Sequence, residues 1–172
     1  MSGTLTLVIG GAASGKSAYA ENLLVRTGKA RVYVATARVL DREMERKVER
    51  HKNMRGAGWD TREAPIAPEQ VLSARKADEC VLLDCATMWL MNHLMDESDM
   101  EKAEADLLQG IADCRADVVV VTNELGLGIV PADPLSRRFR QAQGELNQRL
   151  AAQANAVVNV IAGLPQILKG VL

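Results

Sequence analysis

The chain has 172 residues, of which 48% are hydrophobic and 25% charged, and its formal net charge is −1. This balance is typical of one globular domain with a sizeable core. The near-neutral charge disfavours a nucleic-acid-binding protein, and aromatic residues, at 3%, leave few platforms on which bases could stack. We therefore expect no nucleic-acid partner.

Cysteine usage and the N-terminus indicate the compartment. The sequence has an odd number of cysteines, and none of them has Cys-x-x-Cys spacing: Cys80, Cys85 and Cys114. This argues against a disulfide framework or a structural zinc site. The N-terminus lacks the pattern of a secretory signal, and no run approaches the roughly 20 apolar residues of a membrane span. The sequence predicts a cytoplasmic protein without a membrane span.

Apolar, β-branched runs alternate with helix-like segments along the chain. We predict strands at residues 4–9, 31–36, 79–84, 117–123 and 156–161, and helices at residues 16–27, 41–54, 68–76, 86–95, 99–114 and 134–153. Asp41 and Asp99 are expected to cap two of these helices. The stretch after Gly163 is expected to form a short helix or a loose tail.

The alternation of elements predicts the fold class. Several strands are apolar throughout, as strands covered on both faces should be. Strand–helix alternation indicates βαβ crossovers. We expect an α/β protein with a mostly parallel sheet flanked by helices, built as a single domain over residues 1–172.

A glycine-rich loop follows the first predicted strand and precedes the first predicted helix. Its sequence matches Gly-x-x-x-x-Gly-Lys-Ser/Thr and comprises Gly10, Gly11, Ala12, Ala13, Ser14, Gly15, Lys16 and Ser17. Backbone N–H groups of such a P-loop surround the phosphates of a nucleotide. Lys16 would contact the β and γ oxygens as a catalytic residue, and the Ser17 hydroxyl would bind Mg²⁺. The motif predicts a P-loop NTPase-type domain, and it leaves the phosphate acceptor open.

A second metal-associated carboxylate is expected at the end of another buried strand. Asp84 follows Cys-Val-Leu-Leu, and Glu124 is a competitor after a later apolar strand. We predict that Asp84 binds Mg²⁺ together with Ser17. The alternative is that Asp84 is an ordinary helix cap.

Residues 41–65 combine a histidine with many cations. Lys47, Arg50, Lys52 and Arg55 lie near His51 at helical spacing. Such cations lower the pKa of an imidazole and keep it neutral and nucleophilic. His51 is therefore a candidate for covalent catalysis at phosphorus or for general base catalysis. The alternative is a solvated helix with an incidental histidine, and His93 is expected only to pack.

Eight ordered blocks of the sequence carry a family resemblance. They are GGAASGKS (10–17), VATA (34–37), DREM (41–44), ERHKNMR (49–55), WDTREAP (59–65), LLDCATMWLMN (82–92), VTNELGLGIVP (121–131) and RRFRQAQGELNQRLA (137–151). With these blocks the chain resembles the bifunctional adenosylcobinamide kinase / adenosylcobinamide-phosphate guanylyltransferase family. The resemblance covers nearly the whole chain.

The resemblance implies two reactions in cobalamin biosynthesis. A kinase step would move the γ-phosphate of ATP or GTP to the hydroxyl of adenosylcobinamide. In a second step His51 would attack the α-phosphorus of GTP, and the guanylylated histidine would pass GMP to adenosylcobinamide phosphate, giving adenosylcobinamide-GDP. The substrates would then be GTP, ATP and a corrinoid, with Mg²⁺ as cofactor and a homotrimer as the assembly.

By the same resemblance, further residues would contact the nucleotide. Beyond the loop at residues 10–17 they are Ala35, Thr36, Ala37, Lys52, Asn53, Met54, Arg55, Glu63 and Asp84. Two positions depart from the family pattern, because Ala13 stands where many members carry Arg and Gly56 stands where they carry Pro. Residues 123–128 form a loop that would meet the corrinoid or the metal, or that merely connects two elements.

Two other functions fit part of these observations. One is a P-loop kinase of another pathway in which His51 only binds phosphate. The other is an NTP-dependent switch or assembly ATPase, in which Arg137, Arg138 and Arg140 would imitate an arginine finger.

Overall fold

Parallel strand pairing organises the part of the chain that the structure describes. The computed structural model describes residues 2–39, 42, 46, 49 and 56–172. Its sheet has the order β3-β2-β4-β5-β1-β6-β7. The strands are β1 (Leu5–Gly10), β2 (Ala30–Ala35), β3 (Trp59–Glu63), β4 (Glu79–Asp84), β5 (Asp117–Asn123), β6 (Ala156–Ile161) and β7 (Leu164–Lys169). Every pair is parallel except β6–β7, so the prediction of a mostly parallel sheet is confirmed.

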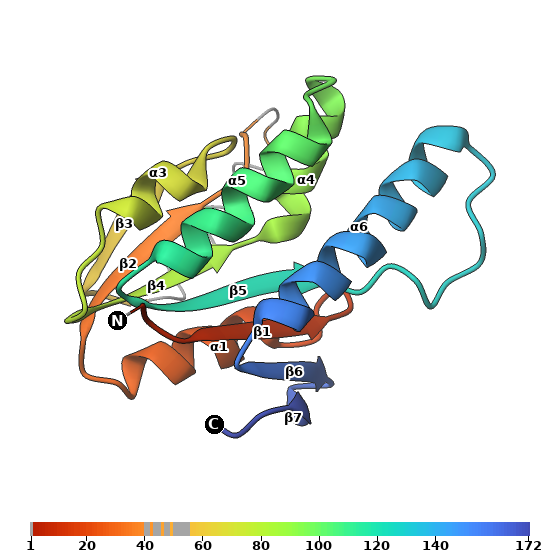
Figure 1. Cartoon of the computed structure of the whole chain (residues 1–172). Helices are drawn as coiled ribbons and strands as arrows, with labels where there is room; N and C mark the ends of the chain where they lie inside the picture. The colour runs from red at the N-terminus through yellow and green to blue at the C-terminus, as the bar shows by residue number, and fades with distance from the viewer. Residues whose placement is uncertain (1, 40–41, 43–45, 47–48, 50–55) are drawn as a thin grey trace.

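Helices cover both faces of the sheet (Figure 1). Helix α1 (Lys16–Val25) lies on one face, below the sheet in this view. On the other face lie α3 (Pro68–Ser73), α4 (Ala86–Met95), α5 (Met100–Asp113) and α6 (Pro134–Gln153). Asp99 caps α5 by accepting a hydrogen bond from the Lys102 N–H, at 3.1 Å, as predicted. None of the helices in the described residues is long and apolar enough to cross a membrane.

The alternation of side chains along each strand produces two cores. Leu5 and Leu7 of β1 pack with α3–α6, whereas Val8 of the same strand packs with Ala20 and Leu24 of α1. The same alternation holds along β4 and β5, whose central residues are almost fully buried. Because both faces are covered, these strands are apolar throughout, and this pattern made them predictable.

Two strands were not predicted, and both lie at an edge of the sheet. Strand β3 is polar, and four of its five residues are exposed, so no apolar pattern marks it. Strand β7 occupies the C-terminal stretch, and the expectation of a short helix or loose tail is wrong. Ala162 and Gly163, with φ of 51° and 78°, form the turn typical of a two-residue hairpin, which returns the chain antiparallel to β6.

A buried polar network joins α6 to the end of β5. The Asn147 Oδ1 atom accepts hydrogen bonds from Thr122 Oγ1 at 2.7 Å and Gln143 Nε2 at 2.9 Å. Its amide nitrogen donates to the Asn123 carbonyl at 3.0 Å. Buried polar groups stabilise a fold only when they are paired, so this network fixes the end of β5 against the helix.

Replacing Asn147 by alanine should lower the free energy of unfolding by about 2 kcal/mol, because Thr122 and Gln143 would lose their shared buried acceptor and the Asn123 carbonyl would lose its donor. Urea denaturation measures this loss. Gln148→Ala, at an exposed position of the same helix, is the matched control and should change stability by less than about 0.5 kcal/mol. Equal effects of the two variants would contradict the role of the network.

Candidate active site

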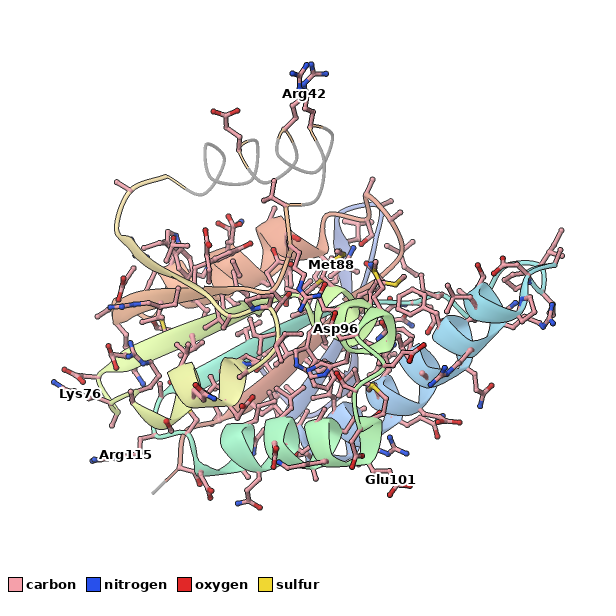
Figure 2. All side chains as sticks on the ribbon, turned by 90° about the horizontal axis from the view of Figure 1, so that it is seen from above. Arg42, Lys76, Met88, Asp96, Glu101 and Arg115 are labelled. Carbon is pink, nitrogen blue, oxygen red and sulfur yellow. The ribbon has the colours of Figure 1, made fainter. Side chains whose placement is uncertain are left out.

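The parallel register brings the predicted site residues to one edge of the sheet. Ala35, at the end of β2, lies opposite Glu63 of β3 on one side and Asp84 of β4 on the other. Further along the same edge, Gly10 of β1 lies opposite Asn123 of β5. Ligands bind outside the carboxyl ends of the strands in open α/β sheets, so this edge is the candidate active site. At the opposite end of the sheet lie Lys76 and Arg115, before β4 and β5 (Figure 2).

The glycine-rich loop forms a turn of backbone between β1 and α1. Gly10 ends the strand and Lys16 begins the helix, with Gly15 at the N-cap in the left-handed region (φ 91°). Ala13 also has a positive φ, of 55°, at the position where the sequence departs from the family pattern. No side chain caps α1, so the first N–H groups of the helix are available to an anion.

The Lys16 side chain folds back over this loop. Its ammonium group donates to the Gly11 carbonyl at 2.9 Å. Burial lowers the pKa of Lys16, and the nearby Asp84 carboxylate acts in the opposite direction. Lys16 therefore lies in a partly buried site near the Asp84 carboxylate.

Asp84 is not a helix cap. The N-cap residue of α4 is Cys85, and no side chain caps that helix. The Asp84 carboxylate instead accepts a hydrogen bond from the Tyr33 hydroxyl at 2.9 Å, which orients it at the end of β4. Within the described residues, no group of three or more His, Cys, Asp or Glu side chains could hold a metal ion.

Thr36 joins the ends of β2 and β4. Its buried hydroxyl both donates to the Cys85 carbonyl and accepts from the Cys85 N–H, each at 2.7 Å. Asn92 of α4 donates to the Thr36 carbonyl at 2.8 Å. These bonds fix the backbone between Ala35 and Ala37, and they occupy the Thr36 hydroxyl, so any nucleotide contact at Thr36 would have to come from another atom.

Glu124 is engaged within its own loop. Its carboxylate accepts from the Gly126 N–H, and the Gly126 carbonyl accepts from Arg140. The Glu124 N–H donates to the Gly10 carbonyl at 3.1 Å. The backbone of Glu124 therefore supports the glycine-rich loop, whereas Asp84 is the carboxylate near Lys16. Arg137 donates to the carbonyls of Pro131 and Ala132.

The proposed nucleophile lies outside the described residues. His51, Lys52, Asn53, Met54 and Arg55 all belong to the part of the chain whose placement is not described, as does Asp41, so their predicted roles stay predictions. The nearby Arg42 side chain points away from the body of the molecule (Figure 2).

The structure places the other histidine and the conspicuous tryptophan in packing positions. His93 is 5% exposed, lies 4.6 Å from the Trp89 ring and approaches the Ile66 carbonyl at 3.0 Å. This confirms that His93 packs. Trp59 meets Tyr33 edge-on at 6.2 Å, and the Arg31 guanidinium lies over its ring at 5.5 Å.

Sequence analysis missed the Gly163 contact at this edge, and it named Asn123 only as part of the loop at residues 123–128. The Gly163 N–H, in the β6–β7 turn, donates to the Ser14 carbonyl at 2.7 Å. The Asn123 Oδ1 atom is buried beside Gly10 without a hydrogen-bond partner. The position of Asn123 after a strand is what indicated it, whereas the contact of Gly163 depends on a hairpin that the sequence pattern did not predict.

A family model described as cobinamide kinase / cobinamide phosphate guanyltransferase matches residues 6–168. The chain belongs to this family. It is 41% identical to the bifunctional adenosylcobalamin biosynthesis protein CobP of Pseudomonas aeruginosa, with 95% of this chain and 96% of that protein covered. It is 39% identical to CobU, the bifunctional adenosylcobalamin biosynthesis protein of Salmonella typhimurium, with 93% and 97% covered.

The fold is shared more widely than the family. The crystal structure of the RadB recombinase matches with a TM-score of 0.54 at 19% identity, over 92% of this chain and 74% of that one. At this identity the likeness concerns the fold alone. It agrees with the predicted α/β architecture of a mostly parallel sheet flanked by helices.

Cys80 and Cys114 are buried and Cys85 is half-buried, and we expect all three thiols to be unreactive. Burial raises the pKa of Cys80 and Cys114, and it raises the pKa of Cys85 to about 12. At about pH 8 only about one Cys85 thiol in ten thousand would be ionised, and the thiolate is the reactive form. Iodoacetamide should therefore label none of the three in the folded protein and all of them in concentrated urea, as mass spectrometry would measure.

A positive control for this measurement is Ser2→Cys, because residue 2 is exposed and should be alkylated in the folded state. Rapid labelling of Cys85 without urea would contradict the burial of its thiol.

Proposed function

We propose that this chain catalyses two reactions on one corrinoid substrate. It first phosphorylates adenosylcobinamide with ATP or GTP, and it then transfers GMP from GTP to adenosylcobinamide phosphate. The observation that carries the proposal is the uncapped N-terminus of α1, which lies beside Lys16 and Asp84. The family to which the chain belongs is described by these two reactions. The reactions would take place in the cytoplasm.

In the kinase step, the chain's own groups would position and neutralise the triphosphate. Backbone N–H groups of residues 11–17 would surround the β-phosphate, and Lys16 would exchange its bond to the Gly11 carbonyl for the phosphate oxygens. The Ser17 hydroxyl and the Asp84 carboxylate are oxygen donors of the kind that Mg²⁺ prefers. Bound there with the phosphates, Mg²⁺ would neutralise charge as it develops on the transferred group.

In the transferase step, His51 would act as the nucleophile. A neutral ring nitrogen attacks the α-phosphorus of GTP, a P–N bond forms, and the bond to the leaving pyrophosphate breaks. The phosphate of the corrinoid then attacks the same phosphorus, and the P–N bond breaks to return the free imidazole. Lys52 and Arg55 would neutralise the phosphates, and Glu63 would accept hydrogen bonds from guanine or ribose.

Two radiolabels separate these steps. With Mg²⁺ and GTP labelled at the α-phosphate, the protein should acquire label that is lost in acid and retained in base, as expected for a phosphorus–nitrogen bond. His51→Ala should abolish this label, because the second of the two histidines, His93, is buried against Trp89. Autoradiography of the protein after denaturing electrophoresis measures both outcomes.

The γ-label is the internal control. His51→Ala should retain transfer of the γ-phosphate to adenosylcobinamide, and Lys16→Ala should lower that transfer by about a hundredfold or more. Arg42→Ala, at an exposed position of the same segment, is the matched control for His51 and should retain both activities. If only γ-label is transferred and His51→Ala has no effect, the chain is a small-molecule kinase. Hydrolysis without any acceptor would instead favour an NTP-dependent switch.

We also propose that the chain forms a homotrimer. The support is an exposed apolar stretch in the loop between β5 and α6. Leu127 and Ile129 are 92% and 96% exposed, and Val130 is 67% exposed. Contiguous apolar surface of this kind is typical of an interaction site, and it fits the assembly that the family resemblance implies.

Light scattering should report a mass of three chains of 18.6 kDa each. The double variant Leu127→Asp/Ile129→Asp should shift the mass toward one chain, because burying two carboxylates in the interface is costly. Val25→Asp, at an exposed apolar position on α1, is the control. A monomeric unmodified protein would contradict the trimer, and a trimeric double variant would contradict this interface.

A further inference from the structure

The glycine-rich loop has different neighbours on its two sides. In the sheet order, β5 and β4 lie on one side of β1, and β6 and β7 lie on the other. Asp84 is on the β4 side and acts electrostatically on Lys16. Glu63 lies still further along that side, at the end of β3. The two carboxylates assigned to the site, Asp84 and Glu63, therefore lie on the same side of the loop.

The β6–β7 turn, residues 161–164, contacts the loop from the other side. The Gly163 N–H donates to the Ser14 carbonyl at 2.7 Å. Gly15 and Gly163 also lie close together, because a Cβ atom added at Gly15 would lie 3.0 Å from the Gly163 Cα atom. The turn is thus part of the wall of the phosphate site.

The β6–β7 turn carries exposed apolar side chains. Ile161 and Leu164 form the cross-strand pair that closes the hairpin, and they are 59% and 71% exposed. The turn has the sequence Ile-Ala-Gly-Leu and contains no ionisable side chain. A purine base or a ribose could pack against the apolar side chains and backbone at this position. The turn has no group that would distinguish the exocyclic substituents of adenine from those of guanine.

We infer that the β6–β7 turn binds the nucleoside of the triphosphate used in the kinase step. A triphosphate whose γ-phosphate faces Lys16 and Asp84 has its α-phosphate and ribose directed away from β4, and the next segment in that direction is this turn. The subsite is apolar and accepts adenosine and guanosine alike. It is separate from the Glu63 side of the loop, where we place the guanosine of the transferase step, so the two reactions use different nucleoside positions around one phosphate site.

This inference rests on nucleotide binding by the loop, which the proposed function requires, and binding measurements test the two separately. In the double variant Ile161→Ser/Leu164→Ser, the dissociation constant of MgATP should rise about tenfold. MgATP is the probe because GTP could still bind with its guanosine on the Glu63 side. Magnesium tripolyphosphate, which has no nucleoside, should bind both proteins within about a factor of two. The matched control is Ile167→Ser/Leu168→Ser, further along the same exposed strand, which should bind MgATP as the unmodified protein does.

Photolabelling of the unmodified protein locates the base directly and does not depend on the folding of a variant. With 8-azido-ATP and Mg²⁺, label that unlabelled ATP displaces should appear in the tryptic peptide of residues 150–169. Label in the peptide of residues 56–62, which lies at β3, would overturn the inference, as would an equal loss of tripolyphosphate affinity in the first double variant. If the unmodified protein bound no nucleotide at all, the proposed function and this inference would both be wrong.

Discussion

Two backbone hydrogen bonds hold the glycine-rich loop in place, and the remaining features of the site depend on them. One runs from the Glu124 N–H to the Gly10 carbonyl, and the other runs from the Gly163 N–H to the Ser14 carbonyl. They come from opposite sides of the loop, so its amide groups keep one arrangement without help from a ligand. A preorganised cradle of this kind needs little rearrangement when an anion enters, which is the physical basis of electrostatic catalysis.

The register of the sheet positions the Asp84 carboxylate. Tyr33 lies within β2, and its hydroxyl donates to the carboxylate of Asp84 on the neighbouring strand. Thr36 then fixes the backbone that follows both strands. These bonds cross between strand ends, so the position of Asp84 relative to Lys16 is a property of the whole parallel sheet. The chain belongs to the cobinamide kinase / cobinamide phosphate guanyltransferase family. A site built in this way agrees with that membership.

Sequence patterns predicted the central strands, the glycine-rich loop and Asp84 because each depends on local chemistry. Buried strands must be apolar on both faces, and a loop that approaches phosphates needs glycine. The edge strands β3 and β7 lack such a signal, because their exposed positions admit polar and apolar residues alike. The contact of Gly163 with Ser14 escaped prediction for a related reason, since it joins residues nearly 150 positions apart. The role of His51, inferred from its cationic neighbours and from the family resemblance, and the role of Glu63, implied by the resemblance alone, stay predictions.

The placement of residues 40–55 between β2 and β3 has an evolutionary consequence. The chain enters this segment after Arg38, which is paired with Asp96 at the end of α4, and it leaves before Ala57, whose carbonyl accepts from Arg31. Both ends are attached to the central fold, and the glycine-rich loop lies in another part of the sequence. A descendant could therefore lose or exchange this segment and keep the glycine-rich loop unchanged. Under the roles proposed above for His51 and the loop, the two activities could then diverge in separate lineages.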